Sequence, residues 1–203
     1  MYKRQGWQYY WYVPQNIPDL IELTGGEDAF CKRLDEFFTS DETSGAKNDN
    51  ASGFVGLYAH GNEPSHHVAY LYAMAGQPAK TQQLVEHIKR TLYNTSSSGY
   101  AGNDDCGEMS AWYVFSALGF YPVNPASGEY VIGSPTVDHA EIMLPGGKKF
   151  TIVVKRKGGA GAAYVKSVKL NGHKLDGYVL KHADIMKAVS YTHLRAHETL
   201  ANL

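Results

Sequence analysis

Apolar residues in the first 125 positions recur at helical spacing. Phe30, Leu34 and Phe37 fall at i, i+4 and i+7, which predicts a helix with one buried face. Residues 68–75 are apolar at nearly every position, so the helix expected there is buried on every face. Shorter helices are expected over 19–24, which ends at Gly25-Gly26, and over 108–118.

The segment after Gln77-Pro78 predicts an amphipathic helix, because proline suits the first helical position. Its apolar stripe consists of Leu84, Val85, Ile88 and Leu92. Its charged side chains, expected to face solvent, are Glu86, Lys89 and Arg90. A helix buried all round followed by one covered on a single side is the arrangement that nested rings of helices need.

After Gly119 the pattern changes to short alternating segments separated by turn residues. Strands are expected over 129–132, 140–144, 149–155, 164–170 and 177–180. Asn171-Gly172 lies between two of them and is typical of a hairpin with a type I′ turn. The pattern therefore predicts an α+β fold, with helices first and an antiparallel β region after them.

The composition narrows the class of protein. The chain has 203 residues, 43% of them hydrophobic, which suffices for a core in one domain or in pieces of two. A formal net charge of -1 argues against a nucleic-acid partner or an anionic membrane surface. No apolar run reaches the ~20 residues of a membrane span, and no signal peptide is visible. Cys31 and Cys106 either pair or are separate small buried residues.

The loop before the 108–118 helix carries two adjacent carboxylates, Asp104 and Asp105, between flexible glycines. Carboxylates on a loop that a buried helix holds still are candidates for chemistry at a pocket rim. A structural alternative exists, because Asp105 and Glu108 have the spacing of a capping box that satisfies helix amides.

A second polar cluster, Asn62 and Glu63 followed by His66 and His67, precedes the buried segment 68–75. Adjacent histidines face different directions on a helix and lack the i, i+4 spacing of a zinc pair, so a transition-metal site is not expected. Hydrogen bonds to a substrate or to core groups are expected instead.

The aromatic stretch Gly6–Pro14 has more rings than one buried face requires, and Gln8 among them is a candidate to bind a ligand hydroxyl. Plain core packing is the alternative. Residues 1–5 and 188–203 resemble translated adapter sequence, so these tails are expected to contribute nothing to the fold. For the second tail, a polar helix over 192–203 is the alternative.

Six short blocks are spread over nearly all of residues 6–187. They are Gly6–Tyr9, Gly61–His67, Ala75–Pro78, Gly102–Val114, Gly119–Pro122 and Asp184–Lys187. In this order they resemble the C-terminal region of glycoside hydrolase family 92, which comprises calcium-dependent exo-acting α-mannosidases that invert the anomeric centre. The resemblance implies that residues 6–125 form the late helices of an (α/α)6 barrel and that 126–187 form an antiparallel β region. It also implies that the N-terminal domain and the first barrel helices are missing.

Inverting hydrolysis uses two carboxyl groups ~6.5–9.5 Å apart, one protonating the leaving oxygen and one activating water. The resemblance assigns the general base to Asp105, with Asp104 and Asn103 beside it. It places the general acid, a glutamate, just before Gly6, where this chain has Lys3-Arg4-Gln5. A cationic side chain cannot replace a tuned carboxylic acid.

The resemblance further implies Ca²⁺ bound by oxygen ligands, with Asn62 and Glu63 forming part of the metal site. The sugar-contacting residues that it implies are Trp7, Gln8, Glu63, His66, His67 and Asn103.

The sequence thus predicts a fragment of an inverting exo-α-mannosidase that carries the general-base loop, lacks the general acid and is inactive alone. Its expected partner is a mannose-containing oligosaccharide, such as mannan or an N-glycan with α-1,2 links. The resemblance places the parent protein in the periplasm or outside the cell. The alternative is a non-catalytic carbohydrate-binding or structural module, in which the acids cap helices and the aromatics fill the core.

Overall fold

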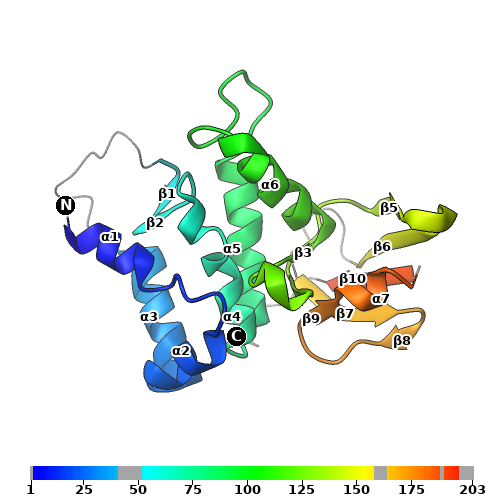
Figure 1. Ribbon diagram of the computed structural model, residues 1–203, viewed down its shortest axis with the longest axis horizontal. Coiled ribbons are helices and arrows are strands. Elements are labelled where there is room, and N and C mark those ends of the chain that lie inside the picture. The colour runs from blue at the N-terminus through cyan, green and yellow to red at the C-terminus, as the bar shows by residue number, and fades with distance from the viewer. Residues whose placement is uncertain (1, 41–51, 158–163, 188–189, 197–203) are drawn as a thin grey trace.

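Most helices occupy one side of the molecule and most strands the other, except that the short strands within residues 54–59 lie among the helices and the short helix at 182–185 lies among the strands (Figure 1). The computed structural model describes residues 2–40, 52–157, 164–187 and 190–196. The helices are α1 (Tyr2–Tyr9), α2 (Ile17–Leu23), α3 (Glu27–Thr39), α4 (Leu71–Met74), α5 (Pro78–Thr91), α6 (Glu108–Leu118) and α7 (His182–Ile185). Single turns of 3-10 helix form η1 (Glu63–Ser65), η2 (Val68–Tyr70), η3 (Asp105–Gly107), η4 (Pro125–Ser127) and η5 (Pro145–Gly147). The helix-then-strand order confirms the α+β prediction.

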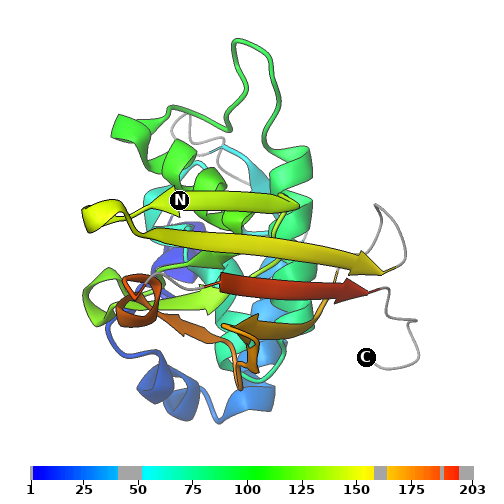
Figure 2. The same cartoon turned by 90° about the vertical axis from the view of Figure 1, so that its right-hand side faces the viewer.

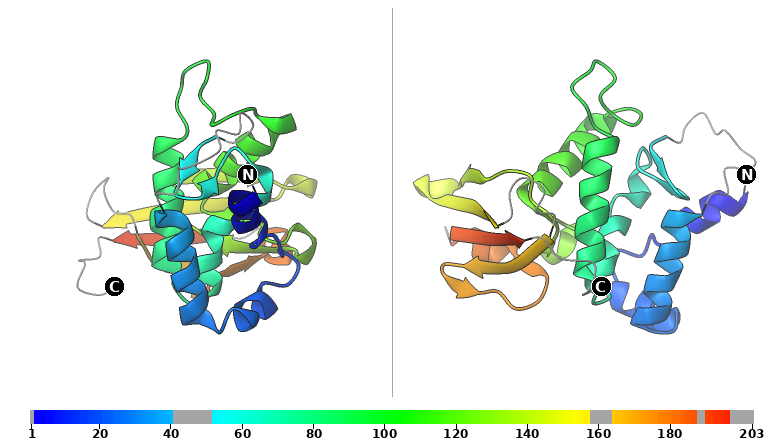
Figure 3. Two further views of the ribbon diagram at one scale, coloured as in Figure 1. Left: turned by 90° about the vertical axis from the view of Figure 1, so that its left-hand side faces the viewer. Right: turned by 180° about the vertical axis from the view of Figure 1, so that it is seen from behind.

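The two long helices bury the faces that their apolar stripes predict. Phe30, Leu34 and Phe37 of α3 are fully buried, and so are Val85 and Ile88 of α5. Helix α5 lies between the first three helices and the strands, as the opposite views in Figure 1 and Figure 3 agree. The core of the helical part therefore forms on one side of α5, and the β part packs on the other.

Lys89 on α5 corrects the expectation that it faces solvent, because only 5% of the residue is exposed. Its Nζ donates to Ser134 O at 2.7 Å and to Thr136 Oγ1 at 2.6 Å. The same nitrogen lies 3.1 Å from Glu86 Oε2. The loop after the strand of residues 129–132 covers this part of α5, so a buried cation ties the helical part to the β part.

Residues 68–75 are as buried as the sequence predicts, since Val68, Ala69 and Leu71 have no exposed surface. They do not form one continuous helix. The segment begins as η2 and becomes the four-residue helix α4 only at Leu71. Packing on every side, rather than a long run of helical hydrogen bonds, stabilises this segment.

The strands form three sheets. The two-stranded sheet pairs β1 (Phe54–Val55) with β2 (Tyr58–Ala59), and the three-stranded sheet has the order β3 (Phe120–Tyr121), β4 (Glu129–Ile132), β9 (Val179–Lys181). The five-stranded sheet has the order β5 (His139–Met143), β6 (Lys149–Lys157), β10 (Ser190–Ala196), β7 (Tyr164–Leu170), β8 (His173–Lys174). Asn171 and Gly172 connect β7 and β8 with φ angles of 49° and 81°, which agrees with the predicted type I′ turn.

Strand β10 corrects the expectation that residues 188–203 contribute nothing to the fold. It is the central strand of the five-stranded sheet, parallel to β6 and antiparallel to β7 (Figure 2). Its residues Tyr191 and His193 are fully buried. The alternative of a polar helix is also wrong over Thr192–Ala196, because this stretch is a strand that pairs with β6 and β7. The rest of that tail lies outside the described residues.

At the other end, α1 begins at Tyr2, so residues expected to form an unstructured tail continue the helix that carries Trp7 and Gln8. Within the described ranges, no helix is long and apolar enough to cross a membrane.

Candidate active site

Asp104 is the carboxylate that holds the start of α6. Its Oδ1 accepts hydrogen bonds from Ser110 N at 2.9 Å and from Ser110 Oγ at 2.7 Å, and its carbonyl accepts one from Met109 N at 3.2 Å. The position before α6 is Gly107, which makes no side-chain cap. The capping box expected of Asp105 and Glu108 is therefore wrong, since Asp104 performs the capping from outside the helix.

Asp105 is exposed, and its backbone has a φ of +47°. Cys106 follows with a φ of +57°. Left-handed backbone at non-glycine residues costs about 1–3 kcal/mol each and concentrates at functional sites. Cys106 is exposed and Cys31 is buried, both as free thiols, so the pairing left open by the sequence is excluded. The strained turn thus leaves Asp105 exposed beside the helix that Asp104 caps.

The acidic loop contacts the loop that carries Asn62 and Glu63. A Cβ atom on Gly61 would collide with the carbonyl oxygen of Ala101, so only glycine permits the approach of these two backbones. Ser52 Oγ also donates to Ala101 O at 2.8 Å. Two turns about forty residues apart along the chain are thus side by side.

Gln8 links α1 to the same loop. Its Nε2 donates to Leu57 O at 3.1 Å, and its Oε1 accepts from Asn62 Nδ2 at 3.1 Å. The residue is only 3% exposed. Gln8 therefore positions Asn62, and this use of its amide agrees with the alternative that it belongs to the core.

His66 and His67 both donate to main-chain carbonyls. His66 Nε2 donates to His60 O and His67 Nε2 donates to Trp11 O, each at 2.8 Å. Burial lowers the pKa of His67 to about 4, against the hydrogen bond to Trp11, so the ring is neutral at pH 7. Of the two roles expected for these histidines, hydrogen bonding to core groups is the one seen in the structure.

A network that the sequence did not reveal lies beneath both loops and is centred on His60. Tyr93 Oη donates to Met109 O at 3.1 Å, so His60 Nε2 donates to Tyr93 Oη at 2.6 Å and Tyr58 Oη donates to His60 Nδ1 at 2.7 Å. Burial, with the nearby His66, lowers the pKa of His60 to about 3, so it also stays neutral. No motif or spacing marks His60, because only the fold brings its partners together.

Helix α6 adds two contacts to this network. His66 Nδ1 lies 3.3 Å from Glu108 Oε1, and Trp112 Nε1 donates to His66 O at 3.0 Å. Glu108 entered the sequence interpretation only as a capping partner, whereas the structure turns it toward His66. The start of α6 is therefore fixed directly to the loop that carries Glu63.

The remaining sequence-predicted residues are placed less centrally. Trp7 lines a hollow of about 350 Å³ with Glu36, Thr39, Ser40 and Leu57. The Arg33 guanidinium lies 4.8 Å from the centroid of the Trp7 ring, so this ring faces α3 while neighbouring Gln8 faces the 57–62 turn. Asn103 is exposed and Glu63 is partly buried. Within the described ranges, no three His, Cys, Asp or Glu side chains gather closely enough to hold a metal ion by themselves.

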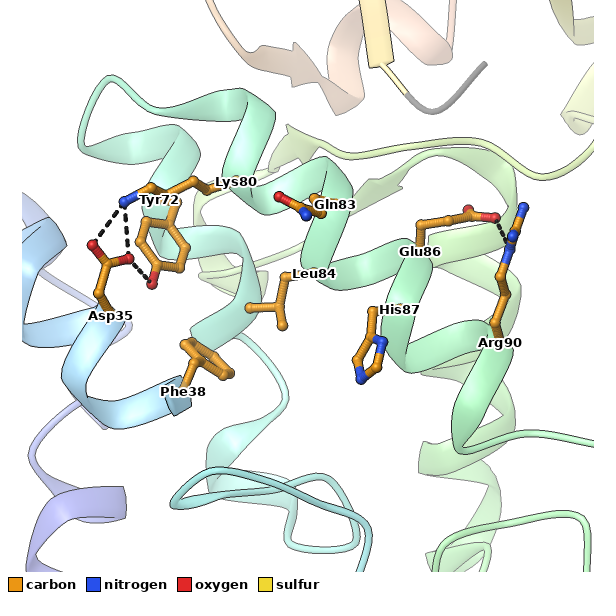
Figure 4. A pocket seen from close by; sticks show the side chains of 9 residues that line it. All are labelled: Asp35, Phe38, Tyr72, Lys80, Gln83, Leu84, Glu86, His87 and Arg90. Carbon is orange, nitrogen blue, oxygen red and sulfur yellow. Dashed lines mark hydrogen bonds and ion pairs between the residues drawn. The ribbon is translucent and has the colours of Figure 1, made fainter. Parts of the chain in front are cut away.

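A larger hollow, of about 490 Å³, opens between α3 and α5, away from these residues (Figure 4). Asp35 lies at one end, where its carboxylate accepts from Tyr72 Oη and pairs with Lys80 at 2.7 Å. Glu86 and Arg90 form an ion pair at the other end. None of the sequence-predicted site residues lines this hollow, so size alone does not locate the candidate site.

The comparisons with known proteins agree with this fold and with these motifs. The match to the glycosyl hydrolase family 92 catalytic domain covers residues 1–193. A family GH92 α-mannosidase from Bacteroides thetaiotaomicron, solved with mannoimidazole, is 38% identical with a TM-score of 0.88 over 95% of this chain. A family GH92 inverting mannosidase from the same species is 36% identical with a TM-score of 0.79 over 93% of this chain.

A protein described as an uncharacterized secreted glycosidase from Arthroderma benhamiae is 32% identical over 139 residues, which is 68% of this chain. Together the fold and the paired loops define a part of a glycoside hydrolase. The chain belongs to glycosyl hydrolase family 92. It spans 16% of the length of the fungal relative and 25% and 27% of the two bacterial structures.

Proposed function

We propose that this chain is the C-terminal part of the catalytic domain of an inverting exo-α-mannosidase and that it supplies the general base, Asp105. The observation that carries the proposal is the division between adjacent carboxylates. Asp104 is occupied by Ser110, whereas Asp105 is exposed on a strained turn beside the loop of Glu63. In this proposal Asp105 removes the proton from water that attacks the anomeric carbon, with Asp104 and Asn103 beside it.

The described helices are proposed to be late members of an (α/α)6 barrel. The η2–α4 segment is buried all round, as an inner member of such rings would be, and the apolar stripe of α5 packs in the same helical core. The general acid comes from chain outside residues 6–187, because the residues before Gly6 are Lys3-Arg4-Gln5. The chain alone is therefore proposed to be inactive.

Calcium binding is part of the proposal, and the residues fit it. Asn62 Nδ2 donates to Gln8, which leaves Asn62 Oδ1 and the Glu63 carboxylate as oxygen ligands of the kind Ca²⁺ prefers. When bound, the ion would help to hold mannose hydroxyls. Gln8 fixes the Asn62 side chain, and the other ligands would come from elsewhere in the parent protein.

The proposed substrate is a mannose-containing oligosaccharide, such as mannan or an N-glycan with α-1,2 links. Trp7, His66 and His67 are proposed to shape the sugar site. The two histidines would do so by stabilising the 60–67 turn, because their Nε2 atoms donate to main-chain carbonyls and not to the substrate. The secreted description of the fungal relative supports a periplasmic or extracellular parent protein.

The test uses a chimera in which this chain, from Gly6 onward, replaces the matching quarter of the 38% identical bacterial enzyme. Mannose release from α-1,2-mannobiose is followed by NMR, and inversion gives β-mannose as the first product. We expect Asp105→Asn to lower kcat by about 10²–10⁴-fold, the usual contribution of a general base. The matched variant Asp104→Ala should lower stability by about 1 kcal/mol, as the loss of a cap does, and lower kcat less. Chelation of Ca²⁺ should lower activity, and added Ca²⁺ should restore it.

Unchanged turnover by Asp105→Asn would instead support the second candidate, a non-catalytic carbohydrate-binding or structural module. The buried roles of Gln8, His66 and His67 are the observations that favour that candidate. Full activity in the presence of chelator would remove calcium from the proposal and leave the role of Asp105 intact.

A further inference from the structure

Tyr100 is an exposed aromatic ring at the base of the acidic loop. It follows α5 in the connection that rises above the helical part in Figure 1, and 42% of the residue is exposed. Its hydroxyl lies 2.9 Å from Ser110 Oγ. Because the single proton of Ser110 Oγ goes to Asp104 Oδ1, the Tyr100 hydroxyl donates to Ser110. One serine hydroxyl thus separates this ring from the acidic pair.

The Tyr100 ring is also held from beneath. It makes an edge-to-face contact with Tyr93, with centroids 6.1 Å apart and planes at 83°. Tyr93 is itself fixed, since its ring stacks on Trp112 at 5.9 Å and its hydroxyl is bonded to both His60 and Met109. An exposed side chain normally rotates freely, whereas this one is ordered at its hydroxyl and along its ring.

A fixed, half-exposed aromatic ring is the surface on which a pyranose packs its C–H bonds, and fixing it in advance avoids the cost of ordering it on binding. The terminal mannose of an exo-enzyme belongs between Asp105 and the loop of Glu63. Tyr100 is bonded to α6 through Ser110, whereas the contact with Gly61 of the 61–67 loop is made by the next residue, Ala101. The ring is therefore placed for the next sugar rather than for the terminal one.

We propose that Tyr100 is the stacking platform for the sugar on the leaving-group side of the scissile bond. The inference rests on the proposed function and deepens it, because it assigns recognition of the second sugar to this chain. The Tyr100 hydroxyl also orients Ser110, so the ring that binds the leaving sugar is linked to the group that holds Asp104. Tyr100 makes the enzyme favour a disaccharide over a substrate with a small leaving group.

The experiment compares two substrates in the chimera described above. The leaving group of α-1,2-mannobiose is a sugar, whereas that of α-mannosyl fluoride is a fluoride ion. We expect Tyr100→Ala to lower the ratio of kcat/KM for mannobiose to kcat/KM for the fluoride about tenfold, mainly through a higher KM for mannobiose. Tyr100→Phe keeps the ring and should lower the ratio about twofold. Tyr9→Ala removes a tyrosine that is 53% exposed on α1 and should leave the ratio as it is.

An equal loss with both substrates would overturn the inference and make Tyr100 a support of the acidic loop only. Unchanged kcat/KM with both substrates would overturn it as well and indicate that other parts of the parent protein cover this ring. Both outcomes leave the proposed function standing, because Asp105→Asn would still abolish turnover of the fluoride. Turnover that is insensitive to Asp105→Asn would remove the proposed function itself, and the inference with it.

Discussion

Strand β10 gives the sharpest test of the fold, because the sequence assigned its residues to a tail and the structure places them in the core. Tyr191 is fully buried, and its ring stacks on Phe150 at 5.9 Å and contacts His193 at 4.4 Å. Its hydroxyl has no hydrogen-bond partner among the described residues. The ring therefore stabilises the sheet, whereas the hydroxyl opposes folding.

Two substitutions separate these effects. Tyr191→Ala leaves a cavity the size of an aromatic ring and should lower the free energy of unfolding by about 3–5 kcal/mol. Tyr191→Phe keeps the ring and removes a buried polar group without a partner, so it should raise the free energy of unfolding by about 1 kcal/mol. Urea unfolding followed by circular dichroism measures both, and Tyr9→Ala, at an exposed position, should change it by less than about 0.5 kcal/mol. If Tyr191→Ala unfolds at the wild-type midpoint, β10 is not a core strand and the tail interpretation returns.

Three further predictions follow from buried or strained groups. Lys89→Ala should lower the free energy of unfolding by about 3 kcal/mol, because it leaves buried oxygens without their cation. Lys80→Ala breaks the more exposed pair with Asp35 and should lower it by less than about 1 kcal/mol. Urea titration of both variants measures this difference. The pKa of His67, about 4, lies below its unfolded value, so the neutral His67 ring contributes fully to stability above pH ~6.5. As the pH falls toward 4 this contribution is lost, and the free energy of unfolding should be lower by about 2 kcal/mol at pH 5. A His67→Gln variant should lack that part of the pH dependence. Cys106→Gly should raise the melting temperature, because glycine adopts a φ of +57° without strain.

The sequence predicted the elements whose cause is local. The apolar stripe of α3 and the Asn171-Gly172 turn follow from spacing and from backbone preference, and both are confirmed. The family motifs marked both polar loops, and the structure places these loops side by side. Its physical cause, the contact of Gly61 with Ala101, is not visible in one sequence, because any glycine in a loop looks alike before its neighbour is known.

Two of the three errors have a common cause in long-range contacts. Lys89 looks like a surface residue until the loop containing Ser134 covers it. The segment 190–196 looks foreign in composition, yet it forms a strand that pairs with β6 on one side and with β7 on the other. Asp105 and Glu108 have the spacing of a capping box but do not form one. Asp104 accepts a hydrogen bond from the Ser110 amide instead, from a turn that no propensity rule anticipates. Partners distant along the chain decided the first two cases, and the third depends on a hydrogen bond across six residues that only the folded turn makes.

The adjacent carboxylates show how this turn can serve stability and chemistry together. A carboxylate that caps a helix directs its lone pairs at helix amides, so it cannot also hold a water molecule freely. If Asp105 were the cap, as its spacing suggested, the helix would consume the proposed base. Because Asp104 takes that role through Ser110, the left-handed turn at Asp105 and Cys106 leaves Asp105 exposed while the helix start stays rigid. The strain of that turn is thus the physical condition for a fixed acid that remains open to solvent.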